Sequence, residues 1–494
     1  MNRPTRVYVV FLDEGYDHAR LHFNRSVLTP EGKRIPRNFV SNADVVAKLH
    51  EMMPEVEFVK RDLDPTPTGY SRLLSEIQQF KDTIDGLVLI GRGRIDMQGI
   101  DAVGQQPLAF TGLPTIHVDN LMKLQPAPYR AFKENGRVVL AELDREGIMP
   151  PEKSQSMFQD LAEKIRLFDA LHRLRESEIL MIKDPDVDID IVDFKVLPPR
   201  YNEMIVGRIK ECFGTEFVFR DLEELVQTYR AVTDEEARPI AEKWIAEAEA
   251  VQPGIEGEIL RAARVYVALE RIVEKAVNEK PAAVMVSDEY MYRIEEGVTT
   301  TTSLAMTEFQ KQGIIGCYGS YTGTTLAQLL GYYAFGRMSY VHDMSIDIAN
   351  NVTLHMHCGT PINDVWGTEN LRYKIRDYTT GKWREDLKRR DGAVPAEVSF
   401  PVGVPVTIWK VFPLQKLIIL FTGVSLDGAE LYREWEDLIC RNKLPLKVED
   451  AEKIAFQRDT HRYGCHFVAT FGDLRNRIKQ LATFIGFEVE EWDR

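Results

Sequence analysis

The sequence predicts an α/β protein of three parts, in which two units that alternate strands with helices precede a β-rich C-terminal part. Short apolar runs alternate with amphipathic helical patterns from the N-terminus. This alternation restarts at Glu178, after the long amphipathic segment Met157–Leu174, and β patterns dominate the last third of the chain. Because 494 residues suffice for about three domains, we expect domains over residues 1–174, 175–350 and 351–494.

The first unit is predicted to be a parallel sheet covered by helices on both faces. Its strands are apolar and rich in β-branched residues, and helical patterns at Asn42–Met53 and Tyr70–Ile84 separate them. The expected strands are VYVVFL at Val7–Leu12, VEFVK at Val56–Lys60, GLVLIG at Gly86–Gly91, TIHV at Thr115–Val118 and VVLAEL at Val138–Leu143. No GxGxxG follows the first strand, and we interpret GRGR at Gly91–Arg94 as a surface turn.

The second unit carries polar residues where three successive strands end. It begins with EILMIK at Glu178–Lys183, and a helix over Asn202–Phe213 that stops at Gly214 follows. The three strands are AVMVSDE at Ala283–Glu289, IIGCYGS at Ile314–Ser320 and SYVHD at Ser339–Asp343. In open α/β sheets, ligands bind beyond the carboxyl ends of the strands. We therefore expect one crevice to collect Asp288, Glu289, Tyr318, Ser320, His342 and Asp343.

The segment Met338–Pro361 holds three of the ten histidines and is predicted to form the floor of an active site. We expect two strands in it, Ser339–His342 and Val352–His357. The ligand-type side chains of the segment are His342, Asp343, Asp347, His355, His357 and Cys358. Several histidines around such a floor more often hydrogen-bond to the ligating groups than bind a metal themselves, so the three histidines are assigned supporting roles.

The β-rich part closes the chain and supplies one further candidate residue. Its expected strands include VPVTIWKVF at Val404–Phe412, KLIILFTG at Lys416–Gly423 and CHFVATFG at Cys465–Gly472, and a helix over Leu474–Gly486 follows. The last of these strands carries His466 between small and apolar residues. Taken alone, such a histidine is more often a core residue than a ligand.

Composition excludes several classes of protein. The net charge of −14, without a long basic run, argues against nucleic-acid binding, and a small polar metabolite is the expected partner. No run of about 18 apolar residues is present, and the N-terminus leads directly into a strand pattern, so we expect a cytoplasmic protein. Five widely spaced cysteines without CxxC favour reduced thiols over a disulfide framework or a structural zinc site.

Several segments resemble the L-fucose isomerase and L-arabinose isomerase superfamily. They are the FGTEF segment Phe213–Trp244, the glycine-rich Gly313–Arg337, the VHD at Val341–Asp343, the HCGTP at His357–Pro361 and the YGCHFVATFGD at Tyr463–Asp473. The resemblance spans nearly the whole chain. It implies two Rossmann-like N-terminal domains, a β-rich C-terminal domain and a homo-oligomer.

The same resemblance implies a divalent metal, usually manganese, held by a Glu, an Asp and a His. Asp343 matches the Asp by position and His466 matches the His. At the position of the Glu this sequence has Tyr318, and a phenol with its usual pKa near about 10 is a poor ligand. We expect Asp288 or Glu289 to replace the missing acid. The predicted assignments are metal ligands Asp343, His466 and Asp288 for Mn²⁺, and catalytic residues Asp343, Tyr318 and Glu289.

The activity that the resemblance implies is aldose–ketose isomerisation of a free pentose or hexose through an enediol. This reaction needs a base for the proton next to the carbonyl and a Lewis acid that holds both substrate oxygens. Two alternatives stay open. Tyr318 also favours a carbohydrate-binding or regulatory relative without catalysis, because aromatic rings stack on sugars. An epimerase on the same scaffold would share the enediol and differ in the path of the proton.

Overall fold

The chain divides into two compact units in a computed structural model. The structure describes residues 3–12, 26–28, 34–36, 40–63, 67–90, 111–120, 136–145, 149–276, 280–287, 301–366, 370–377, 394–435 and 439–494. The first unit comprises Met1–Arg173 with Arg477–Phe487, and the second comprises Leu174–Asn476 with Glu488–Arg494. The finer division into three domains stays a prediction. GRGR at Gly91–Arg94 lies outside the described residues.

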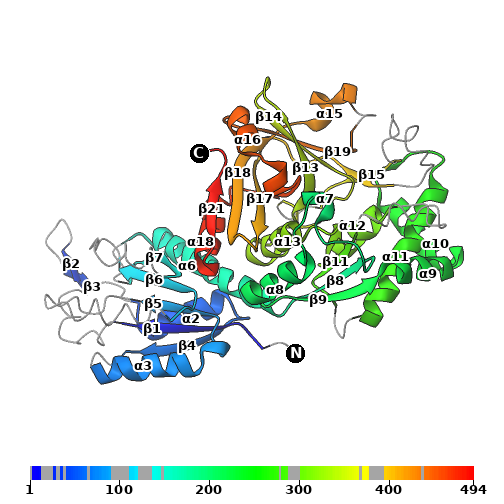
Figure 1. Ribbon diagram of the computed structural model, residues 1–494. Coiled ribbons are helices and arrows are strands. Elements are labelled where there is room, and N and C mark those ends of the chain that lie inside the picture. The colour runs from blue at the N-terminus through cyan, green and yellow to red at the C-terminus, as the bar shows by residue number, and fades with distance from the viewer. Residues whose placement is uncertain are drawn as a thin grey trace. The chain divides into compact units, whose positions relative to one another are not determined.

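The first unit is built on a five-stranded parallel sheet of order β4-β1-β5-β6-β7 (Figure 1). Its strands are β1 (Arg6–Phe11), β4 (Glu57–Asp62), β5 (Gly86–Ile90), β6 (Thr115–Asn120) and β7 (Val138–Leu143). Its other elements are α2 (Asn42–Met52), α3 (Pro67–Gln79), η1 (Lys81–Thr83), α6 (Pro151–Arg175) and the small pair β2 (Ser26–Leu28) and β3 (Arg34–Pro36). The five strands predicted for this unit are therefore confirmed.

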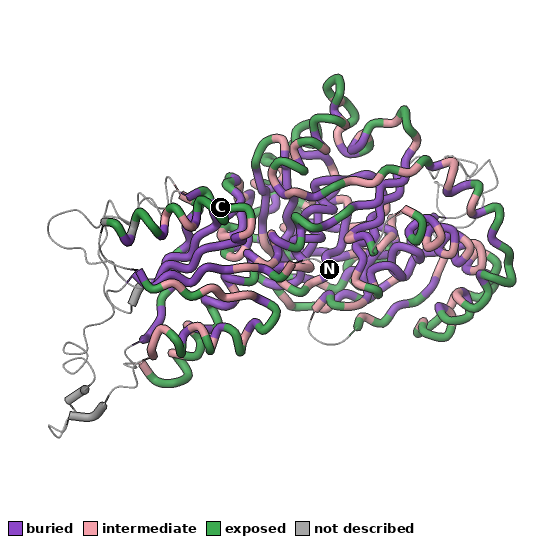
Figure 2. The backbone as a smooth tube through the Cα atoms, turned by 90° about the horizontal axis from the view of Figure 1, so that it is seen from below, coloured by how far each residue is buried: buried purple, intermediate pink, exposed green. Residues whose placement is uncertain are grey.

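Both faces of this sheet are buried, as the continuous apolar runs predict. Tyr8 and Val10, alternate residues of β1, pack in one core with Leu73 and Ile77 of α3. The intervening Val9 points to the opposite face, because side chains alternate along a strand, and it is also fully buried. The inner strands β1 and β5 are buried over almost their whole length, whereas the edge strand β4 is only partly buried, and Figure 2 colours the chain by this burial.

The second unit contains a four-stranded parallel sheet of order β12-β11-β8-β9. These strands are β8 (Glu178–Lys183), β9 (Glu216–Asp221), β11 (Ala283–Val286) and β12 (Ile315–Tyr318). The helices of this part are α7 (Ile191–Phe194), α8 (Tyr201–Phe213), α9 (Leu222–Ala231), α10 (Asp234–Glu247), α11 (Glu256–Ala276), α12 (Ser303–Lys311) and α13 (Thr322–Phe335). As predicted, α8 ends at Gly214, which adopts φ +80°.

A mainly antiparallel sheet of order β17-β20-β13-β14-β19-β18-β21 forms the rest of the second unit. Since β17 also pairs with β18, the first six strands close on themselves as in a barrel. The strands are β13 (Tyr340–Asp347), β14 (Val352–His357), β17 (Pro405–Phe412), β18 (Leu417–Ser425), β19 (Asn442–Lys447), β20 (His466–Phe471) and β21 (Glu488–Glu491). The unit also contains a small sheet of order β10-β15-β16, formed by β10 (Ala250–Val251), β15 (Tyr373–Ile375) and β16 (Ala396–Val398), and the helices α15 (Gly428–Leu431), η3 (Arg433–Trp435), α16 (Ala451–Gln457) and α17 (Thr460–Tyr463). The closing helix α18 (Arg475–Ile485) lies almost wholly in the first unit.

The expectation that SYVHD forms a third strand of the second parallel sheet is wrong. This segment begins β13, which pairs antiparallel with β14 and β20. The strand continues through Asp343 to Asp347. Buried Met344 alternates there with the more exposed Asp343 and Ser345. This alternation is typical of an antiparallel strand that has one face in the core and the other towards solvent. Asp343 therefore lies within a ladder, whereas Tyr318 does end a parallel strand.

The predicted α/β class is confirmed, with parallel sheets and a β-rich sheet in one chain. β21, which pairs parallel with β18 after the closing helix, was not predicted from the sequence. Among the described residues, no helix combines the length and the apolar character that a membrane span requires.

Candidate functional site

Three ligand-type side chains converge at one end of the barrel strands. Asp343 and His466 are direct partners across β13 and β20, and Nε2 of His466 lies 3.4 Å from Oδ1 of Asp343. His357, the last residue of β14, joins them: one ligand atom from each of the three lies within 4.8 Å of the others. We call these residues the Asp343 cluster. The structure thus brings together the predicted ligands Asp343 and His466 and adds His357.

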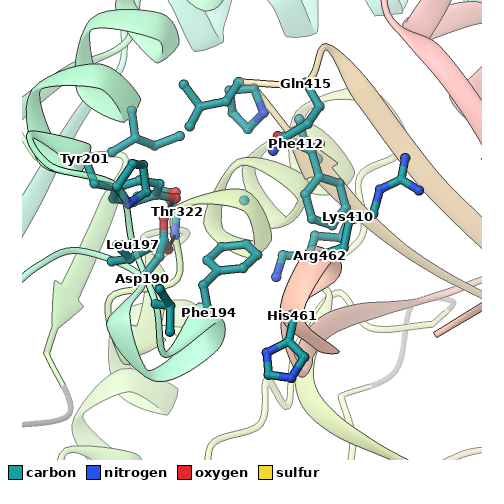
Figure 3. A pocket seen from close by; sticks show the side chains of 17 residues that line it. Asp190, Phe194, Leu197, Tyr201, Thr322, Lys410, Phe412, Gln415, His461 and Arg462 are labelled. Atoms are coloured by element: carbon teal, nitrogen blue, oxygen red, sulfur yellow. Dashed lines mark hydrogen bonds between the residues drawn. The ribbon is translucent and has the colours of Figure 1, made fainter. Parts of the chain in front are cut away.

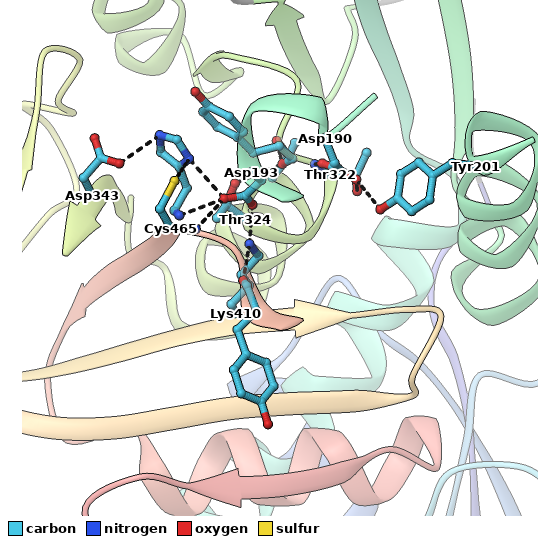
Figure 4. Close-up of polar contacts among 12 residues, drawn as sticks. Asp190, Asp193, Tyr201, Thr322, Thr324, Asp343, Lys410 and Cys465 are labelled. Atoms are coloured by element: carbon cyan, nitrogen blue, oxygen red, sulfur yellow. Dashed lines mark hydrogen bonds and ion pairs between the residues drawn. The ribbon is translucent and has the colours of Figure 1, made fainter. Parts of the chain in front are cut away.

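Asp193 of α7 holds the imidazole of His466 from the other side (Figure 4). Its Oδ1 accepts hydrogen bonds from Nδ1 of His466 at 3.2 Å, from the backbone N–H of His466 at 2.9 Å and from that of Cys465 at 2.8 Å. This arrangement directs Nε2 of His466 towards Asp343. A carboxylate that orients a histidine in this way is typical of metal sites.

The charges around His466 determine its protonation. Burial alone would lower the pKa of this histidine, but the carboxylates of Asp343 and Asp193 raise its pKa well above the usual value. Each ring nitrogen of His466 faces a carboxylate. Only the protonated imidazolium has an N–H donor on both nitrogens, so only this form can donate to both carboxylates. To act as a ligand, Nε2 would have to release its proton, so metal and proton compete for this atom.

A buried lysine completes the support of Asp193. Lys410 of β17, whose side chain is 2% exposed, forms an ion pair with Oδ2 of Asp193 and donates to the carbonyl of Tyr463 at 3.0 Å. Burial opposes ionisation of Asp193, but Lys410 and His466 hold the pKa of this carboxyl below its usual range. Asp193 also lies near Cys465 and His466 in a second ligand-type group, yet its oxygens are already engaged by these donors.

Two glycines permit the close approach of these side chains. Gly464 adopts φ +72° and ψ −172°, and a Cβ on it would lie 2.5 Å from the carboxyl group of Asp193. Gly319 adopts φ +120°, and a Cβ there would lie 2.2 Å from the ring of Tyr321. Only glycine combines these backbone conformations with the absence of a side chain. Asp193 can therefore reach the start of β20, and Tyr321 can stack on His466.

Aromatic rings line the cluster on two sides. Tyr321 stacks on His466 with ring centroids 3.7 Å apart and planes 18° apart. Tyr318, at the position where the resemblance expects a Glu, meets the ring of His357 edge to face at 5.6 Å. The predicted catalytic residue Tyr318 thus lies beside the cluster, in contact with one of its members.

His357 differs from His466 in its protonation. Burial lowers the pKa of His357 to about 4, against the opposing effect of the Asp343 charge, so its imidazole is neutral near pH 7. The backbone N–H of Gly359 makes a long contact of 3.4 Å with its Nδ1. A neutral imidazole is the form that binds metals. His357 therefore suits the role of a third ligand better than the supporting role predicted from the sequence.

The two other histidines of the segment Met338–Pro361 lie apart from the cluster's ligand atoms. His342 and His355 are fully buried and contact each other through their Nδ1 atoms at 3.1 Å, and Thr353 bonds to Nε2 of His355 at 2.9 Å. Burial lowers the pKa of both rings, that of His355 to about 3. They are neutral side chains that bond to each other, to Thr353 and to the backbone carbonyl of Asp343, so their predicted hydrogen bonds to ligating side chains stay a prediction.

The remaining predicted site residues are dispersed. Asp288 and Glu289 lie outside the described residues, so their assignments stay predictions. Asp347, near the far end of β13, bonds to Asn350. Ser320 is buried and its carbonyl accepts from the N–H of Asp190 at 3.1 Å. Cys358 follows His357, and its Sγ lies 4.0 Å from that of Cys440.

Sequence reasoning missed Asp193 and Lys410. The aspartates of the DPDVDIDIVD segment have no spacing that distinguishes one of them as functional. Lys410, however, interrupts the apolar run VPVTIWKVF, and a lysine inside such a strand requires a buried partner of opposite charge. That requirement indicates a hidden carboxylate without identifying it.

The donor set of the Asp343 cluster fits a divalent transition metal. It combines one carboxylate with two imidazoles, and both ligand types are used by manganese, iron and zinc sites in proteins. His466 has the orienting carboxylate that such ligands usually have, and Asp343 is 46% exposed and so accessible from solvent.

Comparisons with known proteins add little to this geometry. No protein-family model matches the chain, and no curated protein matches it. Among solved structures, a periplasmic solute binding protein of an ABC transporter from Actinobacillus succinogenes 130z with bound D-allose is 9% identical, with 63% of this chain and 83% of that chain covered and a TM-score of 0.17.

Two further solved structures have similar values. A solute binding protein from Bacillus halodurans C-125 with bound myo-inositol is 14% identical. The match covers 68% of this chain and 91% of that chain, with a TM-score of 0.18. A LacI family transcriptional regulator from Bifidobacterium animalis subsp. lactis DSM 10140 is 12% identical. The match covers 60% of this chain and 70% of that chain, with a TM-score of 0.15. Similarities this weak establish neither a shared fold nor a shared ligand.

Proposed function

We propose that this chain is a metal-dependent sugar isomerase-like enzyme that interconverts the aldose and ketose forms of a free pentose or hexose. The observation that carries the proposal is the Asp343 cluster, in which Asp343, His357 and His466 offer ligand atoms within 4.8 Å of one another. The orientation of His466 by Asp193 supports it. The proposal includes the domain plan that the resemblance implies, with two Rossmann-like domains and a β-rich domain, and a homo-oligomeric assembly.

The residues of the cluster have distinct roles in this proposal. A bound divalent metal, Mn²⁺ by resemblance, would supply Lewis acidity towards two adjacent oxygens of the sugar. Asp343, His357 and His466 would hold it, and Asp288 remains the proposed acid in place of the carboxylate that is absent at Tyr318. Tyr318 contacts His357 and offers a phenol O–H that can hydrogen-bond to a substrate oxygen. Glu289 is the proposed base for the proton next to the carbonyl.

Metal analysis of the purified protein tests the proposal directly. We expect about one divalent ion per chain, little or none in Asp343→Ala, and chelator-sensitive conversion of at least one sugar in a panel of aldoses. Asp347→Ala is the matched control, because Asp347 is an acid of the same strand that lies outside the cluster. A wild-type protein that takes up no metal on incubation with Mn²⁺, Fe²⁺ or Zn²⁺ would refute the metal site.

Tyr318 favours a second candidate, a carbohydrate-binding relative without catalysis. A phenol at this position removes one negative charge at neutral pH and adds a ring that can stack on a sugar. This candidate predicts that a sugar raises the melting temperature without turnover and that a chelator leaves the increase unchanged. Conversion that yields an epimer in place of a ketose would identify the third possibility, an epimerase.

A further inference from the structure

A cavity of about 240 Å³ lies in the second unit, and none of the Asp343 cluster lines it (Figure 3). Its wall comes from the segment after α7, from α8, from the start of α13, from the end of β17 and from α17. Because a water molecule takes about 30 Å³ in the liquid, the space holds roughly eight non-hydrogen atoms. We call it the Lys410 cavity, after the buried lysine that reaches its wall.

The wall of the Lys410 cavity combines an apolar part with a polar part of similar extent. Phe194, Leu197, Ile205, Phe412 and Leu414 line it, and Ile205 and Phe412 are 2% and 3% exposed. Figure 3 shows the rings of Phe194 and Phe412 beside the open space. A compact apolar body, such as an aromatic ring or a short alkyl chain, would replace water along the apolar part of this wall.

Among the described residues, Asp190 is the acid that lines the cavity, and three hydrogen bonds engage its carboxylate. Oδ1 of Asp190 accepts from the backbone N–H of Thr322 at 2.7 Å. Its Oδ2 accepts from the hydroxyl of Thr322 at 2.7 Å and from that of Tyr201 at 2.9 Å. Asp190 thus holds the start of α13 through both of its carboxylate oxygens.

The basic groups that line the cavity retain donors. Lys410 gives one N–H to Asp193 and one to the carbonyl of Tyr463, and an ammonium has three. Its Nζ lies 5.1 Å from the ring centroid of Phe194 and 5.2 Å from that of Phe412, two of the aromatic residues that line the cavity. Arg462 is exposed and also lines the space. An acceptor with negative charge is therefore the polar group that these walls favour.

We infer that the Lys410 cavity binds a small organic anion, namely a carboxylate on an aromatic ring or a short alkyl chain. The carboxylate lies towards Lys410 and Arg462, and the apolar body lies between Phe194, Phe412 and Leu197. This inference does not require the proposed isomerase activity, because the cavity and the Asp343 cluster share no residue, although Lys410 in the cavity wall also pairs with Asp193, which orients His466.

Ligand-observed NMR with benzoate tests the inference on the full-length wild-type protein. Benzoate has about nine non-hydrogen atoms, and for such a ligand we expect a dissociation constant on the order of 1 mM. Benzyl alcohol has a similar size without the charge and is expected to bind at least about tenfold more weakly. Leu197→Trp fills the cavity from a partly exposed position and is expected to abolish saturation transfer to benzoate.

Charge variants distinguish a specific site from general attraction. Arg462→Glu is expected to weaken benzoate binding by about tenfold, whereas Arg433→Glu, the same change at an exposed residue that does not line the cavity, leaves it unchanged. The metal content of Leu197→Trp should equal that of the wild type. Absence of saturation transfer at about 10 mM benzoate, equal binding of benzyl alcohol, or full binding by Leu197→Trp would overturn the inference.

Discussion

Two buried aspartate–histidine pairs, one in each unit, share their geometry. In the first unit Nδ1 of His172 lies 3.2 Å from Oδ1 of Asp85, and in the second Nδ1 of His466 lies 3.2 Å from Oδ1 of Asp193. Both carboxyl side chains are 1% exposed and both histidine side chains are 5% exposed. By burial and by this contact, the two pairs are nearly the same.

The pairs differ in what faces the second nitrogen of the ring. Nε2 of His172 donates to the carbonyl of Arg3 at 2.9 Å, while the guanidinium of Arg3 binds Asp85. The polar groups of that pair thus hydrogen-bond to other protein groups. Nε2 of His466 ends on Asp343, a carboxylate 46% exposed and close to His357. We therefore interpret the Asp85–His172 pair as structural, because both ring nitrogens of the histidine bond to buried or backbone groups. The Asp193–His466 pair is a candidate site, because the second nitrogen of its histidine faces a partly solvent-exposed carboxylate.

The largest effect is expected from neutralising the carboxylate of the open pair. Asp193→Asn leaves Lys410 buried without its counter-ion and is expected to lower the free energy of unfolding by about 3–5 kcal/mol, measured by urea denaturation. It also removes the group that orients His466, so metal affinity should fall about 10–100-fold.

Asp85→Asn is the matched variant in the closed pair. It should also destabilise, though less, because the side chain of Arg3 is 31% exposed and can be rehydrated. Its metal content should not change. An equal loss of metal in both variants would mean that unfolding, and not the orientation of His466, removes the ion.

Gly464→Ala is expected to have the next largest effect. The variant must place a Cβ at φ +72° and ψ −172°, a conformation that is nearly exclusive to glycine, and 2.5 Å from the carboxyl group of Asp193. We expect a loss of about 2–4 kcal/mol in the free energy of unfolding together with a lower metal content. The control is Gly336→Ala, at φ +64° with no atom within 4 Å of the added Cβ, which should cost only about 1–2 kcal/mol.

The contrast between the two pairs also shows how far the sequence could predict this molecule. The strands of the first sheet were predictable because each is an apolar run between helical patterns, as in Gly86–Gly91. Asp343 and His466 were predictable as a pair through the resemblance. Their pairing across β13 and β20 was not, because SYVHD reads equally well as the end of a parallel strand.

Other parts of the site depend on contacts that no local pattern encodes. Asp193 and His466 are 273 residues apart, and Lys410 and Asp193 are 217 apart. The antiparallel pairing of β17 with β20 brings Lys410 beside the start of β20, and the positive φ of Gly464 lets Asp193 approach the same place. Such long-range pairings are set by topology, so the sequence could indicate only that a buried Lys410 needs a partner.

A smaller effect is expected from the pH dependence of the closed pair. Burial opposes the charged form of His172, but Asp85 raises the pKa of this histidine above its usual value. A histidine with a raised folded-state pKa contributes stability that is complete below the unfolded-state pKa of about 6.5 and is lost as the pH rises through the folded value. Wild-type stability in the first unit should therefore decline above about pH 6.5, whereas His172→Gln should flatten that decline.

Hydrogen exchange of the β5 peptide, measured as a function of pH, would report on this unit separately. After correction for the intrinsic pH dependence of exchange, protection should decrease above about pH 6.5 in the wild type and not in His172→Gln. The opposite trend, with protection increasing over this range, would show that His172 is neutral in the folded protein.

The smallest effect on stability is expected at the open end of the second pair. Asp343 is 46% exposed, and its ion pair with His466 spans 3.4 Å at the edge of the solvent. Asp343 is half-exposed, Asp193 still holds His466, and the amide oxygen of the variant can still accept from Nε2, so Asp343→Asn should change the free energy of unfolding of the metal-free protein by only about 1 kcal/mol. Metal binding should nevertheless be lost, because the amide offers a weaker, uncharged oxygen to a divalent ion.

Urea denaturation in the presence of a chelator, paired with metal titration, would separate the effect on stability from the effect on metal binding. A loss of several kcal/mol in the metal-free variant would show that Asp343 belongs to the folded core and not to a binding site.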